Sequence, residues 1–337
     1  MNSYPEDEGY RAWFDQKNVL ITGGLGFLGS NLAIRLVALG ARVTLMDAML
    51  EDHGGNIFNI AEVKNQIKIN FSDVRDEGTL KYLIKEKDFI FHFAGQNDHV
   101  LSRRNPFLDI DINIKGTATL LENCRKYNPD VRLVYSGTRG EYGAAIRLPV
   151  SEDQPLHPRG IYELSSSSAQ QLFQIYNDND SLRSITLRLT NIYGERAQMK
   201  HNRFGVANWF IRLAIDDSEI SVFGDGTIIR DFLYVQDAVG AMIAAAATER
   251  AYGMVLNVGN DTASNFKELA ETVTRIAGAG RWKYAPFTPE RAAQEPGDFI
   301  SDISRIKRIV GWSPVVSLAD GMSRTIEFYR EHKEHYW

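Results

Sequence analysis

Cysteine is almost absent from this sequence, and its scarcity excludes several classes of protein. The single Cys124 cannot form a disulfide within the chain, and one cysteine cannot build a cysteine metal cluster. The histidines do not have metal-ligand spacing either, so we expect no bound metal. A chain with so little cysteine fits a reducing compartment, and we expect a cytoplasmic protein.

Extreme charge and long apolar runs are also missing. The formal net charge is only -5 at pH 7, which gives no basis for nucleic-acid binding. The apolar run 241–247 is too short to span a membrane. Residues 1–16 are acidic and lack the basic and then apolar segments of a secretory signal, so we interpret them as an N-terminal surface extension. We therefore expect neither nucleic-acid nor membrane partners.

What the sequence does contain near its start is a strand, a glycine turn and a helix in succession. The apolar run 19–21 predicts a buried strand, and leucines at helical spacing predict a helix over 27–39. The glycines between them are spaced Gly23-x-x-Gly26-x-x-Gly29. Backbone N–H groups at such a helix N-terminus lack a partner within the helix and suit a phosphate. The pattern favours dinucleotide binding, and a plain structural turn is the alternative.

An acidic residue lies at the end of the next apolar run. Asp47 follows the predicted strand 41–46, at about the distance expected for the residue that binds an adenosine ribose. Its carboxylate repels a ribose 2′-phosphate, and no arginine follows directly. The pattern therefore favours NAD over NADP.

Apolar strands and amphipathic helices continue to alternate as far as residue 190. Strands are predicted at 67–71, 89–95, 131–135 and 184–189, and helices at 80–84, 110–127 and 162–176. This alternation predicts an α/β fold with a Rossmann-type doubly wound parallel sheet. We expect an NAD-binding domain over 17–190, with parts of 223–262 returning to it. Residues 191–337 are expected to form mainly a smaller α/β substrate-binding lobe.

Several short motifs occur in an order that is typical of one family. They are Thr22-Gly23-Gly24-Leu25-Gly26-Phe27-Leu28-Gly29, Asp73-Val74-Arg75-Asp76, His92-Phe93-Ala94-Gly95-Gln96, Asn191-Ile192-Tyr193-Gly194, Arg230-Asp231-Phe232 and Gly311-Trp312-Ser313-Pro314. In these motifs the chain resembles the extended short-chain dehydrogenase/reductase family, specifically its nucleotide-sugar epimerases and dehydratases. The resemblance implies NAD as cofactor and a nucleotide-diphosphate sugar as substrate. It also implies a homodimer formed through the helices at 110–127 and 162–176.

The resemblance assigns roles to individual residues. Tyr162 has the position of the family's general acid/base, and Thr138 that of the catalytic Ser/Thr, which holds the sugar oxygen. A tyrosine suits proton transfer only if its pKa falls from about 10 toward neutrality. The residues implied in cofactor binding are Gly23, Gly26, Phe27, Leu28, Gly29, Asp47, Asp73, Val74, Ala94, Gly95, Gln96, Asn113, Ser136 and Tyr162.

The catalytic helix departs from the family pattern at one position. The family has Tyr-x-x-x-Lys, and the lysine lowers the tyrosine pKa and holds the nicotinamide ribose. Here Ser166 stands at the lysine position, on the same helix face as Tyr162, and that helix contains no lysine or arginine. We therefore expect Tyr162 to be a weaker base, unless the NAD ring or another cation compensates. A catalytically silent homologue is the alternative.

The residues after Thr138 narrow the reaction. The family's 4,6-dehydratases have Asp-Glu there, the acid and base that eliminate water, whereas this chain has Arg139 and Gly140. We therefore expect a 4-epimerase that acts through a transient 4-keto sugar. A 4-dehydrogenase that releases the keto sugar is the alternative, and a dehydratase is less favoured.

Two arginines and an asparagine join Thr138 as candidates for substrate binding. Arg230 is expected to bind a substrate phosphate, because a guanidinium forks onto phosphate oxygens, and pairing with Asp231 is the alternative. Asn191 is expected to reach the sugar or the phosphate. Arg139 meets either a carboxylate or phosphate of the substrate, or a surface salt-bridge partner.

One expected phosphate contact is missing near the C-terminus. Most relatives have arginine before Pro-Gly-Asp, where this chain has Glu295. Arg291 is the candidate that substitutes for it.

Overall fold

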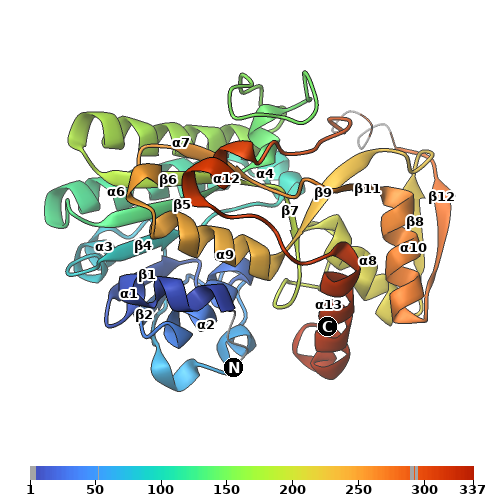
Figure 1. The fold of residues 1–337 in the computed structure, drawn as a ribbon, viewed down its shortest axis with the longest axis horizontal. Helices are drawn as coiled ribbons and strands as arrows, with labels where there is room; N and C mark the ends of the chain where they lie inside the picture. The colour runs from blue at the N-terminus through green and yellow to red at the C-terminus, as the bar shows by residue number, and fades with distance from the viewer. Residues whose placement is uncertain (1–4, 52, 289–291, 293–294) are drawn as a thin grey trace.

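The centre of the protein is a parallel sheet of seven strands, in the order β10-β6-β5-β4-β1-β2-β3 (Figure 1). The computed structural model describes residues 5–51, 53–288, 292 and 295–337. The strands are β1 (Asn18–Thr22), β2 (Arg42–Met46), β3 (Lys68–Asn70), β4 (Phe89–His92), β5 (Arg132–Thr138), β6 (Arg183–Leu189) and β10 (Val255–Val258). The chain runs outward from β1 to one edge and then from β4 to the other, so the strand order reverses between β1 and β4. Ligands of such sheets bind beyond the carboxyl ends at this reversal.

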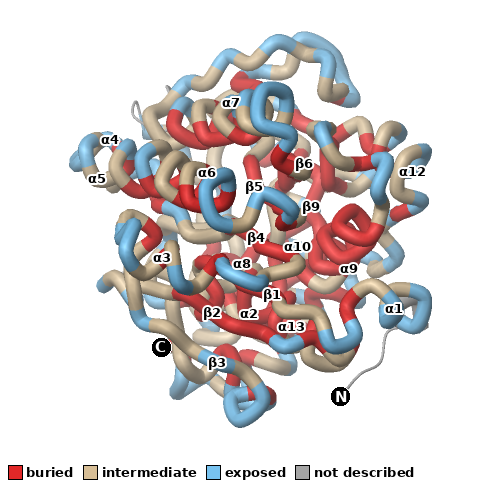
Figure 2. The backbone as a smooth tube through the Cα atoms, turned by 90° about the vertical axis from the view of Figure 1, so that its left-hand side faces the viewer, coloured by how far each residue is buried: buried red, intermediate tan, exposed pale blue. Residues whose placement is uncertain are grey.

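Helices cover both faces of the sheet, as a doubly wound fold requires. One face carries α3 (Glu77–Leu83), α6 (Gly116–Tyr127) and α7 (Ile161–Asp180), and the other carries α2 (Phe27–Ala38) and α9 (Val235–Ala246). Successive residues of β1 point into different layers: Leu20 joins the core under α6 and α7, whereas Val19 and Ile21 join the core under α2 and α9. Burial on both faces explains why these strands are continuously apolar. Figure 2 shows buried backbone along the central strands and α9.

A smaller α/β lobe stands beside the sheet, at the right of Figure 1. It contains a three-stranded sheet, β11-β9-β7, and a two-stranded sheet, β12-β8. Its elements are β7 (Asn191–Tyr193), α8 (Val206–Ile215), β8 (Glu219–Phe223), β9 (Ile229–Tyr234), β11 (Ala263–Asn265), α10 (Phe266–Ala277), β12 (Arg281–Ala285) and α13 (Leu318–Glu331). The chain returns to the main sheet through α9 and β10, within the range 223–262. The proposed domain boundaries stay a prediction.

Shorter elements connect these layers. They are α1 (Arg11–Phe14), α4 (His99–Arg104), α5 (Pro106–Ile110), α12 (Ser304–Val310), a π-helical turn at Asp111–Lys115, and 3-10 helices at Pro5–Tyr10, Ile57–Ile60, Lys64–Gln66, Arg139–Tyr142, Glu249–Ala251 and Lys333–His335. The N-terminal segment ends in Phe14, which is fully buried against Phe89 with 4.9 Å between ring centroids. Among the described residues, the helices are too short or too polar to cross a membrane.

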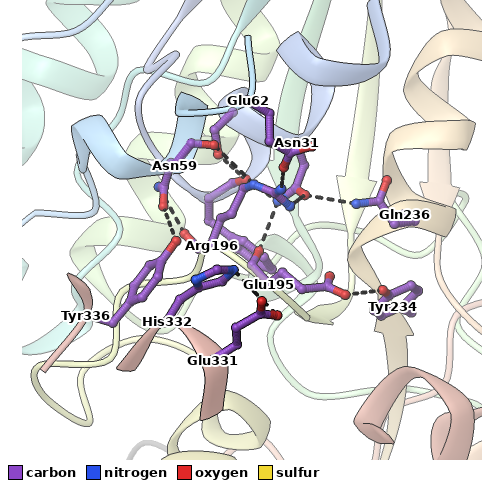
Figure 3. A network of polar contacts seen from close by, with 12 residues as sticks. Asn31, Asn59, Glu62, Glu195, Arg196, Tyr234, Gln236, Glu331, His332 and Tyr336 are labelled. Carbon is purple, nitrogen blue, oxygen red and sulfur yellow. Dashed lines mark hydrogen bonds and ion pairs between the residues drawn. The ribbon is translucent and has the colours of Figure 1, made fainter. Parts of the chain in front are cut away.

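A polar network ties the layer of α2 to the second lobe and the C-terminus (Figure 3). Asn31 of α2 donates its side-chain amide to the Glu195 carbonyl at 3.0 Å, and Arg196 Nη1 donates to Asn31 Oδ1 at 3.1 Å. Tyr336 donates its hydroxyl to Asn59 Oδ1 at 2.7 Å. These hydrogen bonds join segments that are far apart in sequence, and so they help to fix the position of the two lobes relative to each other.

Candidate active site

A cavity of about 1050 Å³ lies at the carboxyl ends of the sheet strands. The predicted site residues that line it are Gly23, Gly26, Phe27, Leu28, Gly29, Asp47, Asp73, Val74, Ala94, Gly95, Gln96, Asn113, Ser136, Thr138, Arg139, Tyr162, Ser166 and Asn191. Arg230 does not line the cavity, and Arg291 lies outside the described residues. The fold therefore brings segments from the carboxyl ends of β1, β2, β3, β4, β5 and β6 to a single cavity.

The glycine turn at one end of the cavity leaves no room for side chains. Gly23 has a φ of +67°, and a Cβ there would lie 2.8 Å from the Ala94 nitrogen. A Cβ on Gly29 would lie 2.3 Å from the Gly23 carbonyl oxygen. These contacts let α2 begin directly against β1, so its N-terminal amides face the cavity. A backbone cradle of this kind fits a pyrophosphate.

Two carboxylates stand at the same end. Asp47, just after β2, accepts hydrogen bonds from the backbone nitrogens of Leu25 at 3.0 Å and Met49 at 2.9 Å. Burial raises the pKa of Asp47, and the two backbone bonds oppose that shift. Asp73 pairs with Arg75 at 2.7 Å, and this hydrogen bond lowers the pKa of Asp73. Asp73 is held by a neighbour on its own loop, whereas Asp47 is held both by its own loop and by Leu25 of the glycine turn.

The wall between the two ends of the cavity is built around a π-helical turn. Asn113, within that turn, accepts a hydrogen bond from the Gln96 nitrogen and donates one to the Gln96 carbonyl, both at 2.8 Å. Single π turns in helices are frequent at functional sites because they redirect a side chain. Here the turn aims Asn113 at the loop after β4 and fixes the backbone that lines the cavity.

A buried histidine supports this wall from behind. His92 lies between two threonine hydroxyls, with Nδ1 2.7 Å from Thr22 Oγ1 and Nε2 3.1 Å from Thr117 Oγ1. Burial lowers the pKa of His92 to about 4. The imidazole is therefore neutral at pH 7 and serves as a packed, hydrogen-bonded core residue.

Tyr162 and Thr138 meet at the middle of the cavity. Thr138 is the last residue of β5, and Tyr162 lies in the first turn of α7. Burial raises the pKa of Tyr162, the carboxylates of Glu163, Glu141 and Asp109 add to the rise, and a hydrogen bond with the Thr138 side chain opposes it. The net direction is upward, so the phenol holds its proton in this structure.

The lysine position is occupied by a hydroxyl that is bonded to a buried acid. Ser166 donates its Oγ–H to Glu141 Oε1 at 2.9 Å, and the Thr138 nitrogen donates to the same oxygen at 2.9 Å. Arg188 Nε lies 3.3 Å from the other Glu141 oxygen. Burial raises the pKa of Glu141, and Arg188 opposes that shift. The burial of Glu141 and its hydrogen bond to Ser166 are evident only in the structure.

A histidine that no motif singled out packs against Tyr162. The rings of His99 and Tyr162 meet edge to face, with 5.0 Å between centroids. His99 Nδ1 lies 2.8 Å from Glu163 Oε1, and all three residues line the cavity. Arg203, from the second lobe, also lines it and pairs with Asp98 at 3.0 Å. Nothing in the local sequence around His99 indicates this contact, because α4 and α7 meet only in the tertiary fold.

The two arginines predicted to bind the substrate lie in different environments. Arg139 lines the cavity and donates from Nη2 to Asn191 Oδ1 at 3.3 Å. Arg230 is buried, pairs with Glu295, and donates from Nη1 to the Gly297 carbonyl at 2.6 Å. Arg230 thus pairs with Glu295, at the position where relatives have arginine. A substrate contact by Arg230 stays a prediction.

Comparisons with known proteins agree with this geometry. Residues 19–259 match the NAD dependent epimerase/dehydratase family. The chain is 31% identical to a UDP-glucose 4-epimerase of Mycolicibacterium smegmatis, over 94% of this chain and 99% of that one. It is 28% identical to a dTDP-glucose 4,6-dehydratase of an Actinoplanes species, over 94% and 98%. The structure of a Thermotoga maritima UDP-glucose 4-epimerase with UDP-glucose superimposes with a TM-score of 0.85, at 28% identity, over 94% and 99% of the two chains.

The fold and the cavity define a Rossmann-type protein of the extended short-chain dehydrogenase/reductase class. Within that class, the chain belongs to the NAD-dependent epimerase/dehydratase family. Its relatives include nucleotide-sugar epimerases and nucleotide-sugar dehydratases at similar identity.

Proposed function

We propose that this protein is an NAD-dependent 4-epimerase of a nucleotide-diphosphate sugar. The observation that carries the proposal is the placement of Tyr162 and Thr138 in the same cavity as the glycine turn. Elimination of water needs an acid and a base beside the sugar, and the residues after Thr138 are Arg139 and Gly140. Epimerisation at C4 needs no such additional pair, because one residue, Tyr162, serves as base and then as acid.

The chain's own residues supply a seat for NAD. The N-terminal amides of α2 would hold the pyrophosphate, and Asp47 would accept hydrogen bonds from the adenosine ribose. Its carboxylate disfavours a 2′-phosphate, so NAD is preferred to NADP. When bound, NAD supplies the hydride acceptor and donor.

Tyr162 and Thr138 divide the proton chemistry at the sugar. Thr138 would hold the 4-oxygen by a hydrogen bond. Tyr162 would first release its own proton to solvent, and the phenolate would then accept the 4-hydroxyl proton as the C4 hydrogen leaves as hydride to the cofactor. After the 4-keto sugar turns over in the cavity, the hydride would return to the opposite face of C4, and Tyr162 would return the proton to the 4-oxygen. Ser166 and Glu141 carry no positive charge to assist the loss of the Tyr162 proton.

A second candidate function follows from that last point. The pKa of Tyr162 is raised rather than lowered, and the family lysine is replaced by a serine bonded to a carboxylate. A protein that binds NAD and a nucleotide sugar without turnover fits this arrangement as well.

We propose that the protein acts as a homodimer through α5, α6 and α7. Large apolar side chains stand exposed on these helices: Phe107 is 78% exposed, Leu164 53%, Ile175 50% and Ile110 42%. An apolar surface of this kind is typical of a protein interface. Sedimentation analysis of the wild type beside a Phe107→Lys, Leu164→Lys variant tests the interface, because the charges should shift the protein to monomer. Cytoplasmic location is proposed from cysteine use alone.

The functional proposal is tested with purified protein, NAD and a panel of UDP- and dTDP-linked hexoses. Conversion to the C4 epimer without net NADH supports the epimerase. Stoichiometric NADH with a released keto sugar identifies a 4-dehydrogenase instead, and loss of water identifies a dehydratase. Calorimetric binding of NAD and a nucleotide sugar with no product in any reaction identifies the silent binding protein.

A further inference from the structure

The guanidinium of Arg139 lies at the cavity but has no role in the proton chemistry proposed above. Arg139 follows Thr138 directly and lines the cavity. Among the described residues, its side chain makes one hydrogen bond, to the neutral acceptor Asn191 Oδ1. The ring of Phe299 lies behind it, 5.1 Å from the guanidinium carbon, and is itself buried. Asn191 and Phe299 therefore hold the planar group in one orientation at the cavity wall.

The carboxylates around Arg139 are committed to other partners. Asp231 accepts hydrogen bonds from Thr190 Oγ1 and, at 3.1 Å, from the Ser301 nitrogen. Glu295 pairs with Arg230, and Glu163 with His99. Among the described residues, no ion pair joins Arg139 to a carboxylate. Burial and the neighbouring charge of Arg230 lower the pKa of Arg139 to about 10, and the more distant carboxylates of Asp231, Glu295 and Glu163 oppose that shift. The guanidinium therefore stays charged at pH 7, and its direct hydrogen bond goes to an amide oxygen.

We propose that Arg139 binds a carboxylate on the sugar, so that the substrate is a nucleotide-diphosphate hexuronate. This inference rests on the proposed function and names the substrate class of that same site. A guanidinium presents two parallel N–H donors that match the two oxygens of a carboxylate.

The position of Arg139 distinguishes a sugar carboxylate from the diphosphate. Consecutive Cα atoms are about 3.8 Å apart, so Arg139 lies beside the residue that holds the 4-oxygen. In a hexuronate the carboxylate is attached to C5, next to the carbon being oxidised. The diphosphate is attached to C1, on the opposite side of the six-membered ring from C4. With Thr138 at the 4-oxygen, this arrangement favours the carboxylate over the diphosphate as the anion at Arg139.

The test measures binding to the NAD-loaded protein by calorimetry, with UDP-glucuronate, UDP-galacturonate, UDP-glucose and UDP as probes. Glucuronic acid 1-phosphate and glucose 1-phosphate form a second pair that does not depend on the base. The wild type should bind the hexuronate member of each pair at least about tenfold more tightly. Arg139→Gln should weaken hexuronate binding by about 30-fold or more and leave UDP and UDP-glucose within about threefold. Arg139→Lys keeps the charge without the fork and should fall between the two.

The matched control is Arg147→Gln, which removes an exposed arginine of a neighbouring loop and should change no affinity. Equal losses for UDP, UDP-glucose and UDP-glucuronate in Arg139→Gln would place the diphosphate at Arg139 and overturn the inference. Tight binding and turnover of neutral hexoses, with no preference for hexuronates, would also overturn it while leaving the epimerase proposal intact. Failure to bind any nucleotide sugar or sugar phosphate would remove the proposed function, and the inference with it. Unchanged NAD affinity confirms that each variant is folded.

Discussion

The two ends of the cavity follow the family pattern to different degrees. At the cofactor end, the glycine turn, Asp47 and the Asp73-Val74 pair are all present and assembled. At the end proposed for the substrate, the resemblance marks three differences: Ser166 stands for the family's lysine, Glu295 for the arginine of most relatives, and Arg139 for the aspartate of the 4,6-dehydratases. The end proposed for the cofactor is built mainly from backbone geometry. The end proposed for the substrate differs from the family pattern in a few charged or polar side chains.

This difference has a physical origin. Gly29 and Gly23 tolerate almost no substitution, because a Cβ added to them would lie 2.3 Å and 2.8 Å, respectively, from neighbouring backbone atoms. Charges in a desolvated cavity, by contrast, can be exchanged in compensating sets. The pairing of Arg230 with Glu295 is such a case, because the acid that replaces an arginine neutralises a second arginine. Reaction and substrate can therefore change while the cofactor stays the same.

The largest effect is expected at the centre of the substrate end. Tyr162→Phe removes the only oxygen proposed to carry the substrate proton, so turnover should fall by about 10²- to 10⁴-fold. NAD affinity should stay unchanged, because the cofactor end is built from other residues. Steady-state kinetics with calorimetric NAD binding measures both. Tyr176→Phe, on the same helix, is the matched control, and activity retained in Tyr162→Phe removes this residue from the mechanism.

Acid should lower the free energy of unfolding through protonation of His92. Its pKa is about 4 in the folded protein against 6.5 when free, so the unfolded chain binds more protons between these values. Unfolding free energy should therefore rise with pH across that window and lose about 3 kcal/mol on acidification from its upper to its lower limit. Denaturant titrations at several pH values measure this slope.

The comparison variant is His92→Gln, whose amide can bond both threonines without titrating. It should flatten the part of the pH dependence that falls within this window. If wild type and variant respond identically to acid, another group is responsible.

A smaller change at the glycine turn tests the backbone cradle. Gly29→Ala places a Cβ against the Gly23 carbonyl oxygen, a contact between backbone segments that cannot relax cheaply. We expect a loss of about 1–3 kcal/mol in stability and weaker NAD binding. Thermal unfolding with and without NAD measures it. Gly9→Ala, where nothing lies within 4 Å of the added carbon, is the control, and equal behaviour of the two variants contradicts the steric account.

The smallest effect is expected from a substitution of Ser166. Ser166→Lys places an ammonium beside Glu141 and near Tyr162, which should lower the pKa of Tyr162. The pH profile of turnover should then move about one to two units toward acid. Ser166→Met offers similar length without charge and should leave the profile in place. A profile that does not move in Ser166→Lys shows that the missing charge is irrelevant or is supplied by another group.

Sequence patterns predicted most of the fold and the outline of the site. The helix predicted over 27–39 and the predicted strands of the main sheet lie close to their predicted limits, because apolar periodicity reports burial directly. Two details differ. The predicted strand 89–95 ends at His92, because the residues after it leave the ladder to line the cavity. The predicted helix 110–127 begins with a π-helical turn that serves Asn113.

Contacts between distant segments could not be anticipated in the same way. His99 reaches Tyr162 from another helix, and Arg188 reaches Glu141 from the neighbouring strand β6. Arg230 was expected to meet a phosphate or Asp231, yet the fold brings Glu295 to it. Such pairings depend on which loops meet at the edge of the sheet, and local residue spacing carries no signal for that.

The sequence by itself determined the parallel sheet, the glycine turn with its acidic partner, and the replacement of the family lysine by Ser166. These features are local, because periodicity and short spacing encode them. Only the tertiary structure decided which charges are neutralised and which are not: Arg230 is paired, Glu141 is buried with Ser166, and Arg139 faces the cavity beside a neutral amide. The reason is that the field at a buried group is the sum over all neighbours in space, and those neighbours come from the whole length of the chain.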